Sequence, residues 1–447
     1  MNLREIVLDI LLELSRGGEY SNILISAVLD KYDYLDSREK AFIKRVSEGC
    51  IERRIQIDHV LDQFSKTPVR KMKPLIRELL RMSTYQLLFM EHIPDAAVCN
   101  EAVKLAKKRK FQALQGYVNG VLRNIARGRE KISYPDRVTS YREYLSVQYS
   151  MPLWLVEQFA DCYGEDFCEK ILQAYLERKS VGVRIRENLP QGEQERLIAA
   201  WEQAGICVRR HPYLSYAVEL EGIEGIRRME GYEEGLFAVQ DVSSMLVVET
   251  AGIRLGDTVV DVCAAPGGKA LHAADKLAGT GQVIACDVTD HKTARIVENQ
   301  TRLGIQNVSV KVQDARIQEP SLLEKADVLL VDVPCSGLGV IGRKQDIKYR
   351  VTPESLQEIN CLQREIVANV VKYVKPGGIM MYSTCTMNPS ENEEMAAWIC
   401  EDLGMEKVNI APFLPEALWQ DARENALQLL PGVHETDGFF MAKFRKR

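Results

Sequence analysis

From about residue 240 onward, short apolar segments rich in β-branched residues alternate regularly with segments of helical character. Continuous apolar strands that alternate with helices are typical of a mostly parallel sheet whose two faces are both covered by helices. This part of the chain is therefore predicted to be an α/β domain. Its strands are expected at residues 259–263, 283–287, 308–312, 328–333 and 379–383.

The rest of the chain divides by pattern into two further regions. Residues 1 to about 130 carry apolar side chains at helical spacing, which predicts an all-α region. The stretch 128–139 is polar, contains Gly128 and Pro135, and loses this period, so it is expected to be a linker. Residues after it mix helical and strand-like segments and predict a small α/β domain. We therefore predict domains at 1–135, 140–235 and 236–447.

Two helix starts are marked in the C-terminal region. Thr352 followed by Pro353 fits an N-cap and a first helical residue. Ser390 with Glu393 fits a capping box, in which the two side chains satisfy each other's backbone N–H groups. We expect helices to begin at both places.

Composition narrows the class of protein. The 447 residues are 46% hydrophobic and 27% charged, as in soluble globular proteins, and no uncharged apolar run approaches the roughly 18 residues that span a membrane. The 11 cysteines form no CxxC pair, which argues against a disulfide framework and a zinc ribbon. We expect a cytoplasmic protein. Residues 1–140 carry 25 Lys and Arg against 18 Asp and Glu, so the acidic chain has a basic N-terminal part that permits RNA binding.

The first candidate site is the sequence DVCAAPGGK, where a predicted buried strand turns into a helix. Adjacent glycines allow a ligand close to the backbone, and a helix start offers free N–H groups, although a tight turn alone would also need glycine. Asp287 ends the next strand, where an acidic residue typically binds a ribose diol. This turn lacks the GxGxxG pattern, and GxxxxGK[ST] does not occur in the chain, so a nucleoside without a phosphate chain is favoured.

Further chemistry-bearing residues end the other predicted strands. Asp314 could hold an adenine amino group or be a solvated turn residue. Asp332 and Cys335 follow the fourth strand, and Cys385 follows the fifth. Either cysteine alone could be inert core, but both belong to one sheet edge with the glycine turn. A thiolate nucleophile with a neighbouring acid is the equipment of covalent catalysis.

The motifs DVCAAPGGK, ACDV, QDA, DVPCSGLG and YSTCT occur in this order and resemble those of S-adenosylmethionine-dependent RNA cytosine-C5 methyltransferases. The segments VCNEAVKLAKK and GYVNGVLRNI resemble the NusB-type RNA-binding domain. The combination is similar to the RsmB (Sun/Fmu) family of 16S ribosomal RNA methyltransferases. The resemblance implies an all-α NusB-like domain, a small α/β domain and a Rossmann-like methyltransferase domain.

The resemblance also implies a role for each motif residue. Asp287 would bind the ribose of S-adenosylmethionine and Asp314 its adenine, while Asp332 would lie beside both the cofactor and the target base. Cys385 would be the nucleophile, and Cys335 would assist product release. The remaining cofactor-binding residues would be Cys263, Ala264, Ala265, Pro266, Gly267, Gly268 and Lys269. The partner would be 16S rRNA. The six histidines show no metal-ligand spacing, so we expect no metal ion, and we expect a monomer.

Several alternatives stay open. The chain could be a NusB-like RNA-binding assembly factor without catalysis, or an enzyme acting on DNA with Cys335 as the nucleophile. The basic run 107–110 could contact RNA or be a solvated helix face. Lys269 could raise the positive potential of the site or be a plain surface lysine. His272 and His291 are expected to face solvent.

Overall fold

The computed structural model describes residues 2–177 and 180–447. The chain forms two compact units. One comprises Met1–Leu176 together with Ile341–Arg350, and the other comprises Glu177–Val340 together with Val351–Arg447. The short segment 341–350 therefore belongs to the N-terminal unit, although it lies within the C-terminal region of the sequence.

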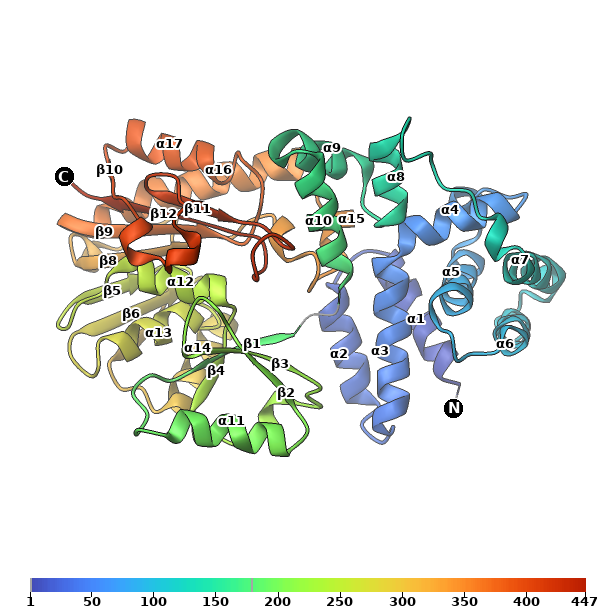
Figure 1. Ribbon diagram of the computed structural model, residues 1–447, viewed down its shortest axis with the longest axis horizontal. Coiled ribbons are helices and arrows are strands. Elements are labelled where there is room, and N and C mark those ends of the chain that lie inside the picture. Colours follow the sequence, from blue (N-terminus) through green and yellow to red (C-terminus); the bar gives the residue numbers. More distant parts are fainter. Residues whose placement is uncertain (1, 178–179) are drawn as a thin grey trace. The chain divides into compact units, whose positions relative to one another are not determined.

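The N-terminal unit is helical (Figure 1), as predicted for residues 1 to about 130, and it also contains helices between 141 and 176, which lie within the range predicted for the small α/β domain. Each helix buries one apolar stripe, and α5 lies at the centre, where it packs against α1, α3, α4, α6 and α7. Pro74 at the first position of α5 and the capping box of Asp36 and Glu39 at α3 mark helix starts. The helices are α1 (Leu3–Ser15), α2 (Ser21–Lys31), α3 (Ser37–Glu52), α4 (Arg54–Phe64), α5 (Pro74–Phe89), α6 (Asp95–Lys108), α7 (Gln115–Arg127), α8 (Tyr141–Gln148), α9 (Leu153–Tyr163) and α10 (Glu165–Leu176).

The segment 341–350 contains α15 (Ile347–Arg350) and is bonded to these helices. Asp346 accepts hydrogen bonds from the backbone N–H and the hydroxyl of Ser21, at 3.0 and 2.8 Å. The buried Lys348 ammonium donates to the carbonyl of Glu52 at 2.8 Å. The guanidinium of Arg54 lies 3.5 Å from the centre of the Tyr349 ring. These contacts explain why the segment belongs to the N-terminal unit.

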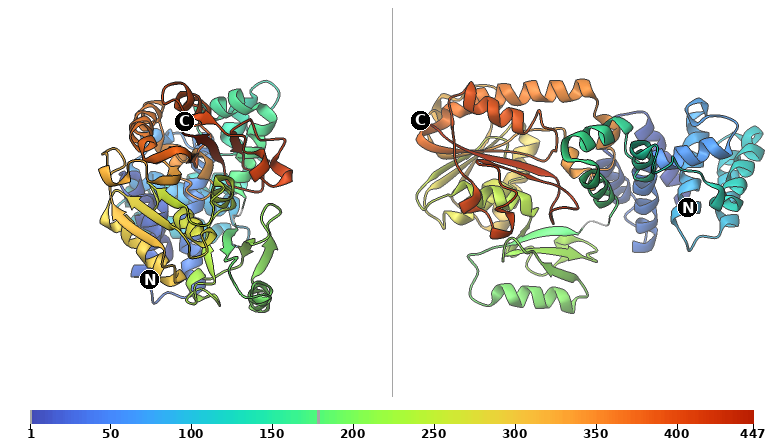
Figure 2. Two further views of the ribbon diagram at one scale, coloured as in Figure 1. Left: turned by 90° about the vertical axis from the view of Figure 1, so that its left-hand side faces the viewer. Right: turned by 45° about the horizontal axis from the view of Figure 1, so that its top comes forward.

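A small antiparallel sheet begins the second unit, with strand order β2-β3-β1-β4. Its strands are β1 (Val181–Ile185), β2 (Cys207–Arg210), β3 (Ala217–Glu221) and β4 (Phe237–Val239). Helix α11 (Glu193–Gln203) covers one face of this sheet (Figure 2). It buries Trp201 against Phe237, with ring centroids 5.0 Å apart. This is the small α/β domain that the sequence predicts.

The larger sheet of the second unit has the order β10-β12-β9-β8-β5-β6-β7, and β11 pairs with β12. Strands β5 to β9 are mutually parallel, whereas β12 runs antiparallel to β9, so the sheet is mixed but mostly parallel, as predicted. The strands are β5 (Thr258–Asp261), β6 (Gln282–Asp287), β7 (Val308–Val312), β8 (Ala326–Asp332), β9 (Val374–Thr384), β10 (Glu406–Lys407), β11 (Ala426–Leu429) and β12 (Phe439–Arg445).

Helices cover both faces of this sheet (Figure 1). On one face, α12 (Val242–Ala251), α13 (Gly268–Lys276) and α14 (Asp290–Leu303) share a core with the strands. On the other face, α16 (Pro353–Val370) and α17 (Glu393–Glu401) form a second core. Thr352 caps α16 as predicted.

The capping box predicted at Ser390 is wrong. Helix α17 begins at Glu393 with Asn392 as its N-cap residue, and no side chain caps it. The amide of Asn392 is instead bonded to the carbonyl of Thr386 and the side chain of Gln428, at 3.1 and 2.8 Å. Residues 388–392 thus form a buried loop that returns to the end of β9.

Candidate active site

The glycine-containing turn joins β5 to α13 at the carboxyl edge of the sheet. Gly267 is the N-cap of α13 with φ of +107°, a conformation that favours glycine. Its N–H donates to the carbonyl of Ala264 at 2.6 Å, which closes the turn. The first N–H groups of α13 follow this turn directly, and N–H groups at the start of a helix attract polar ligands.

Asp287, at the end of β6, braces this turn. Its carboxylate accepts hydrogen bonds from the backbone N–H groups of Ala265 and Val288, at 2.9 and 2.7 Å. The exposed Lys292 ammonium approaches the same carboxylate at 3.0 Å. A carboxylate can accept about four hydrogen bonds, so Asp287 keeps room for another donor. Asp314, after β7, forms a local ion pair with Arg316 at 2.6 Å, and this pair lowers the pKa of its carboxyl.

The two predicted cysteines lie together. The Sγ atoms of Cys335 and Cys385 are 3.2 Å apart, within hydrogen-bond distance for a thiol and a thiolate. All eleven cysteines are free thiols. The loop after β8 reaches the end of β9 through the N–H of Gly339, which donates to the carbonyl of Cys385 at 3.0 Å. The carboxyl ends of two adjacent parallel strands therefore bring both sulfurs to one place.

Lys269 is a buried member of this site and not a surface residue. It is 8% exposed, and its ammonium donates to the Asp332 carboxylate at 2.7 Å and to the Ser244 hydroxyl at 3.2 Å. Burial would lower the pKa of Lys269, but the charge of Asp332, with which it is hydrogen bonded, outweighs burial and raises it. The ammonium therefore stays charged, and it also interacts electrostatically with Cys385.

The electrostatic surroundings of the two sulfurs differ. The hydrogen bond to Cys385 and burial raise the pKa of Cys335 well above that of an ordinary thiol. Negative charge on Cys385, Glu391 and Asp332 adds to this rise. Cys385, by contrast, has the Lys269 ammonium as a neighbour, and a nearby cation favours a thiolate. The site thus favours a neutral Cys335, and it places the positive charge of Lys269 near Cys385.

Sequence reasoning missed several residues that shape this site. Asp261 lies at the end of β5, is 1% exposed, and has its pKa raised to about 7, mainly by burial. Glu391 is fully buried and is bonded to Ser336, which follows Cys335 directly. The Ser336 hydroxyl also contacts that of Thr386, which follows Cys385, at 2.7 Å. Asp261, Ser336 and Thr386 lie within the quoted motifs, whereas the only signal for Glu391 was the polar run after the second cysteine motif.

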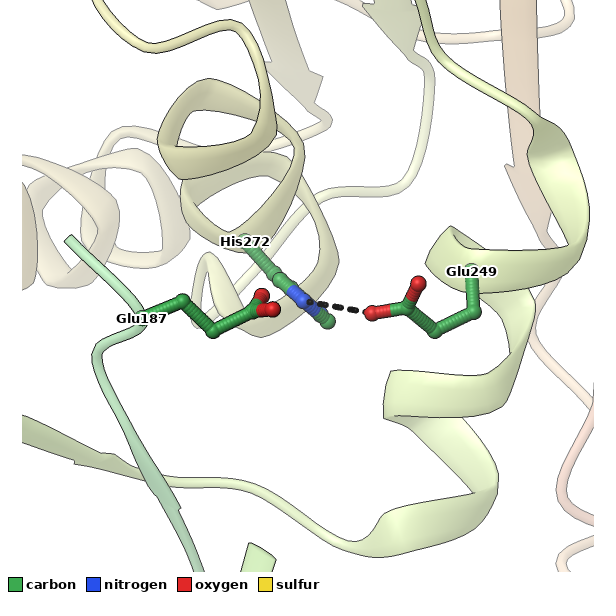
Figure 3. A group of neighbouring side chains, drawn as sticks. All are labelled: Glu187, Glu249 and His272. Atoms are coloured by element: carbon green, nitrogen blue, oxygen red, sulfur yellow. Dashed lines mark ion pairs between the residues drawn. The ribbon is translucent and has the colours of Figure 1, made fainter. Parts of the chain in front are cut away.

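His272 does not face solvent, contrary to the prediction. It lies on α13 and is fully buried. Its Nε2 lies 3.6 Å from the Glu249 carboxylate, and Glu187 is close by (Figure 3). Although these three groups could surround a metal ion, the ammonium of Lys276 already pairs with both carboxylates at 2.6 Å. Burial and the charges of Arg184 and Lys276 lower the pKa of His272 well below its ordinary value, so it is neutral.

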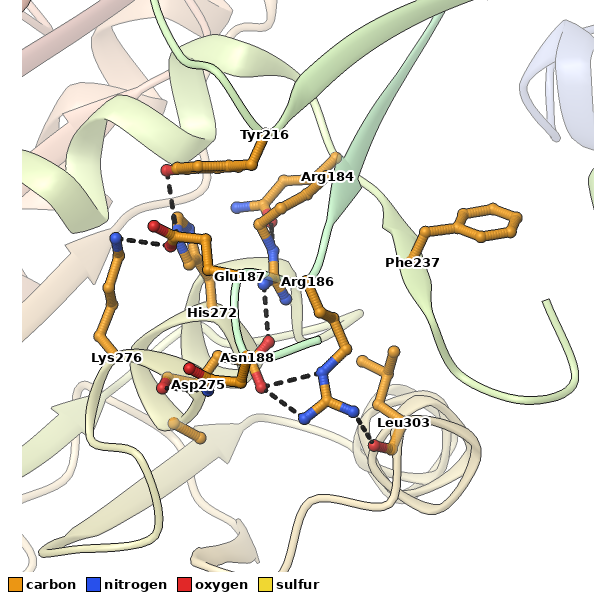
Figure 4. A network of polar contacts seen from close by, with 12 residues as sticks. Arg184, Arg186, Glu187, Asn188, Tyr216, Phe237, His272, Asp275, Lys276 and Leu303 are labelled. Atoms are coloured by element: carbon orange, nitrogen blue, oxygen red, sulfur yellow. Dashed lines mark hydrogen bonds and ion pairs between the residues drawn. The ribbon is translucent and has the colours of Figure 1, made fainter. Parts of the chain in front are cut away.

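The same region joins the small sheet to the larger sheet through buried ion pairs (Figure 4). Asp275, on α13, accepts hydrogen bonds from Arg184 at 2.6 Å and from Arg186 at 2.8 and 3.1 Å. Arg184 also donates to the side chain of Gln240 at 2.9 Å. The helix that carries Lys269 is thereby fixed from its far end.

The basic run 107–110 of the N-terminal unit is partly neutralised within its own domain. Lys108 pairs with Glu5 at 2.6 Å, and Arg109 pairs with Glu5 at 3.2 Å and with Asp9 at 2.5 Å. Lys107 and Lys110 are exposed. Among the described residues, no helix has the length and apolar character needed to cross a membrane.

Comparison with known proteins agrees with this architecture. Residues 252–445 match the family model of the 16S rRNA methyltransferase RsmB/F, residues 1–127 match the NusB family, and residues 151–226 match the ferredoxin-like domain of RsmF/B-like methyltransferases. A probable ribosomal RNA small subunit methyltransferase B of Bacillus subtilis is 36% identical over the whole chain and 99% of its own length.

A second relative and a solved structure agree with this match. A second probable ribosomal RNA small subunit methyltransferase B, from Synechocystis, is 30% identical and matches over the full length of both proteins. The solved methyltransferase homologue from Pyrococcus horikoshii covers 69% of this chain and 100% of its own, with a TM-score of 0.59 at 25% identity. The chain therefore belongs to the RsmB/F family of ribosomal RNA small subunit methyltransferases.

Proposed function

We propose that this protein methylates carbon 5 of a specific cytosine in 16S ribosomal RNA, using S-adenosylmethionine and a covalent cysteine adduct at carbon 6. The observation that carries the proposal is the pair of sulfurs 3.2 Å apart beside the buried Lys269–Asp332 ion pair. Family membership supports the same reaction class and the ribosomal substrate.

The residues at the carboxyl edge of the sheet fit S-adenosylmethionine. Asp287 retains acceptor capacity for a ribose hydroxyl, and Lys292, being exposed, can move aside for it. Asp314 would bind the adenine after exchanging its contact with Arg316. The turn from Cys263 to Lys269 supplies backbone N–H groups and no phosphate-binding motif. When bound there, the cofactor would supply an electrophilic methyl group.

Two cysteines are needed because carbon 5 of cytosine is a poor nucleophile. The Cys385 thiolate adds to carbon 6, and the electrons of the C5–C6 double bond then make carbon 5 nucleophilic toward the methyl group. The Lys269–Asp332 pair provides hydrogen-bonding groups for the cytosine ring, where charge develops. Asp332 was expected beside the target base, and Lys269 is bonded to it there.

Product release requires loss of the carbon 5 proton and departure of the Cys385 sulfur. Cys335 contacts that sulfur and is a thiol, so it can stabilise the departing thiolate by donating a hydrogen bond. Water would accept the carbon 5 proton. Without Cys335, the covalent adduct would persist.

The NusB-like domain would bind the RNA. We propose a division of labour along the predicted regions, with residues 1–135 binding RNA, 140–235 forming a connecting domain and 236–447 performing methyl transfer. Lys107 and Lys110 are the members of the basic run that remain available for phosphate contacts, because Lys108 and Arg109 are paired with acidic residues of α1.

The test is transfer of labelled methyl groups to unmethylated small-subunit rRNA, with denaturing gels to detect protein–RNA adducts. We expect Cys385→Ala to be inactive and free of adduct, and Cys335→Ala to accumulate adduct. Cys361→Ala, at an exposed cysteine of α16, serves as the matched control and should behave as wild type.

Other outcomes would favour the rival functions. Adduct lost in Cys335→Ala and kept in Cys385→Ala would reverse the two cysteine roles. Transfer to a matched DNA in preference to RNA would indicate a DNA methyltransferase. A wild-type protein that binds the RNA without transferring any methyl group would be an assembly factor.

A further inference from the structure

Glu391 is a fully buried carboxylate held by four donors, none of which is charged. Its Oε2 accepts from the backbone N–H of Ser336 at 2.9 Å and from the Gln363 amide at 2.8 Å. Its Oε1 accepts from the Ser336 hydroxyl at 2.6 Å and from the Asn388 amide at 3.0 Å. A buried carboxylate is costly unless its lone pairs are satisfied in this way, so its presence calls for a function.

These bonds surround Cys335. Gln363 donates to the carbonyl of Pro334, before the cysteine, at 3.0 Å, and Glu391 accepts from Ser336, after it. Gln363 also contacts Glu391, so the carboxylate and the amide enclose the cysteine loop between them. The backbone on both sides of Cys335 is therefore fixed.

The same network extends to the second cysteine. The Ser336 hydroxyl lies between Glu391 and Thr386, and Thr386 directly follows Cys385. Residues 388–392, which carry Glu391, return to the end of β9 through Asn392, whose amide donates to the carbonyl of Thr386. One carboxylate thus connects the residues that follow both sulfurs.

We propose that Glu391 is a positioning residue that holds the two cysteine loops together and keeps Cys335 a neutral thiol beside the Cys385 thiolate. This inference rests on the proposed function, since it explains how two adjacent cysteines take different roles. Glu391 is fully buried and acts through Ser336 and through its charge.

The charges around the two sulfurs agree with this assignment. Cys335 is faced by Cys385 from β9, by Glu391 from the loop before α17, and by Asp332 from β8. Tyr382 of β9 is buried, and burial together with the charges of Glu391, Cys335 and Asp332 raises the pKa of its phenol, so it stays neutral. Lys269 of α13 is the cation of the site, and it is bonded to Asp332 and interacts with Cys385. Glu391 therefore adds negative charge near the sulfur that is to stay protonated.

The first experiment measures how fast iodoacetamide alkylates each cysteine of the full chain as a function of pH, with peptide mass spectrometry to separate Cys335 from Cys385. It needs no RNA, so it reports on Glu391 even if the protein proves not to be a cytosine methyltransferase. We expect Cys335 in Glu391→Gln to react at lower pH than in wild type and about tenfold faster at neutral pH, as expected for a pKa change of about one unit. The control Glu394→Gln makes the same charge change at an exposed site of α17 and should leave both profiles unchanged.

The second experiment separates positioning from charge. Ser336→Ala removes the hydroxyl between the two loops and keeps the buried carboxylate. We expect it to leave the pH profile of Cys335 unchanged, to slow adduct formation by more than tenfold, and to change the KM for RNA by less than about twofold.

Either of two results would overturn the inference. An unchanged pH profile of Cys335 in a folded Glu391→Gln would exclude the electrostatic role. Wild-type rates of adduct formation in Ser336→Ala would exclude the positioning role, and this variant stays informative if Glu391→Gln fails to fold. If wild type transfers no methyl group yet the alkylation profiles shift as expected, the proposed function fails while the role of Glu391 in thiol ionisation stands.

Discussion

At the scale of single residues, the buried Asp261 makes the stability of the protein depend on pH. Burial raises its pKa to about 7, from an ordinary value of 3.8, although Lys269 opposes the rise. The folded chain therefore binds this proton more tightly than the unfolded chain, and the free energy of unfolding falls as pH rises from about 4 to about 7. This loss of stability accompanies the burial of an acidic residue that interacts electrostatically with Lys269.

Asp261→Asn should remove this dependence, because the amide is isosteric and does not titrate. Between pH 5 and pH 8, wild type is expected to lose about 2–3 kcal/mol more of its free energy of unfolding than the variant does. Urea denaturation at the two pH values measures the difference. Equal losses in both proteins would show that Asp261 is ionised throughout, with Lys269 compensating its burial.

The sequence allowed a site residue to be predicted where that residue follows one of the parallel strands. Cys335 and Cys385 were expected to meet because both follow parallel strands of one sheet, and their sulfurs do meet. The partners of buried charges were not predictable in this way. Lys269 and Asp332 are 63 residues apart, and their pairing depends on the packing of α13 against the sheet. Glu391 carried no recognised motif, and Ser390 beside it suggested a helix cap that does not form.

At the scale of elements, the loop after β8 and the loop before β12 approach so closely that side chains would separate them. The backbone N–H of Gly438 donates to the carbonyl of Gly339 at 3.0 Å. A Cβ atom on Gly339 would overlap the carbonyl of Gly438 and lie 2.8 Å from that of Cys385. The glycine is therefore required by the contact that holds Cys335 against Cys385.

Gly339→Ala should consequently impair catalysis more than stability. Overpacking of this kind costs about 1–3 kcal/mol, whereas displacing a reacting group by about 1 Å can reduce the rate about 100-fold. Thermal denaturation and methyl transfer measure the two effects. Gly225→Ala is the control, because a Cβ there meets no atom within 4 Å. A fully active Gly339→Ala would mean that the close contact is dispensable.

The predictability of elements follows their patterns. Strands β5 to β8 were predicted within a few residues because buried parallel strands form continuous apolar runs. Strand β12 was not predicted, because Lys443 interrupts its apolar run. In the structure this lysine is 2% exposed, and its ammonium donates to the carbonyl of Thr250 at 2.7 Å and lies 3.3 Å from the centre of the Phe413 ring. The sequence shows only a charged residue at this position and does not show the partners that allow it to be buried.

At the scale of the whole molecule, chain order and spatial grouping differ. The segment 341–350 follows the Cys335 loop in sequence but belongs to the N-terminal unit, through the bonds of Asp346, Lys348 and Tyr349. Hydrophobic periodicity carries no information about such long-range membership, so this grouping could not be predicted. The assignment of separate roles to residues 1–135, 140–235 and 236–447 stays a prediction.

Within the second unit, the small sheet and the methyltransferase domain are joined by the buried contacts of Asp275. The Arg184 side chain is 1% exposed and that of Asp275 is 4% exposed. Removing one member of a buried ion pair leaves the other charge without compensation and typically costs about 3–5 kcal/mol. We therefore expect Asp275→Ala to lower the free energy of unfolding by about that amount, as measured by urea denaturation.

A second ion pair between the same two domains provides the comparison. Arg227 and Glu298 lie 3.2 Å apart, but their side chains are 72% and 62% exposed. Such pairs contribute at most about 1 kcal/mol, so Glu298→Ala should have little effect. If both variants lost equal stability, burial of the Asp275 network would not be what joins the domains. If only Asp275→Ala is destabilised and it also loses methyl transfer, the contacts of Asp275 at one end of α13 are needed to position Lys269 at the other end.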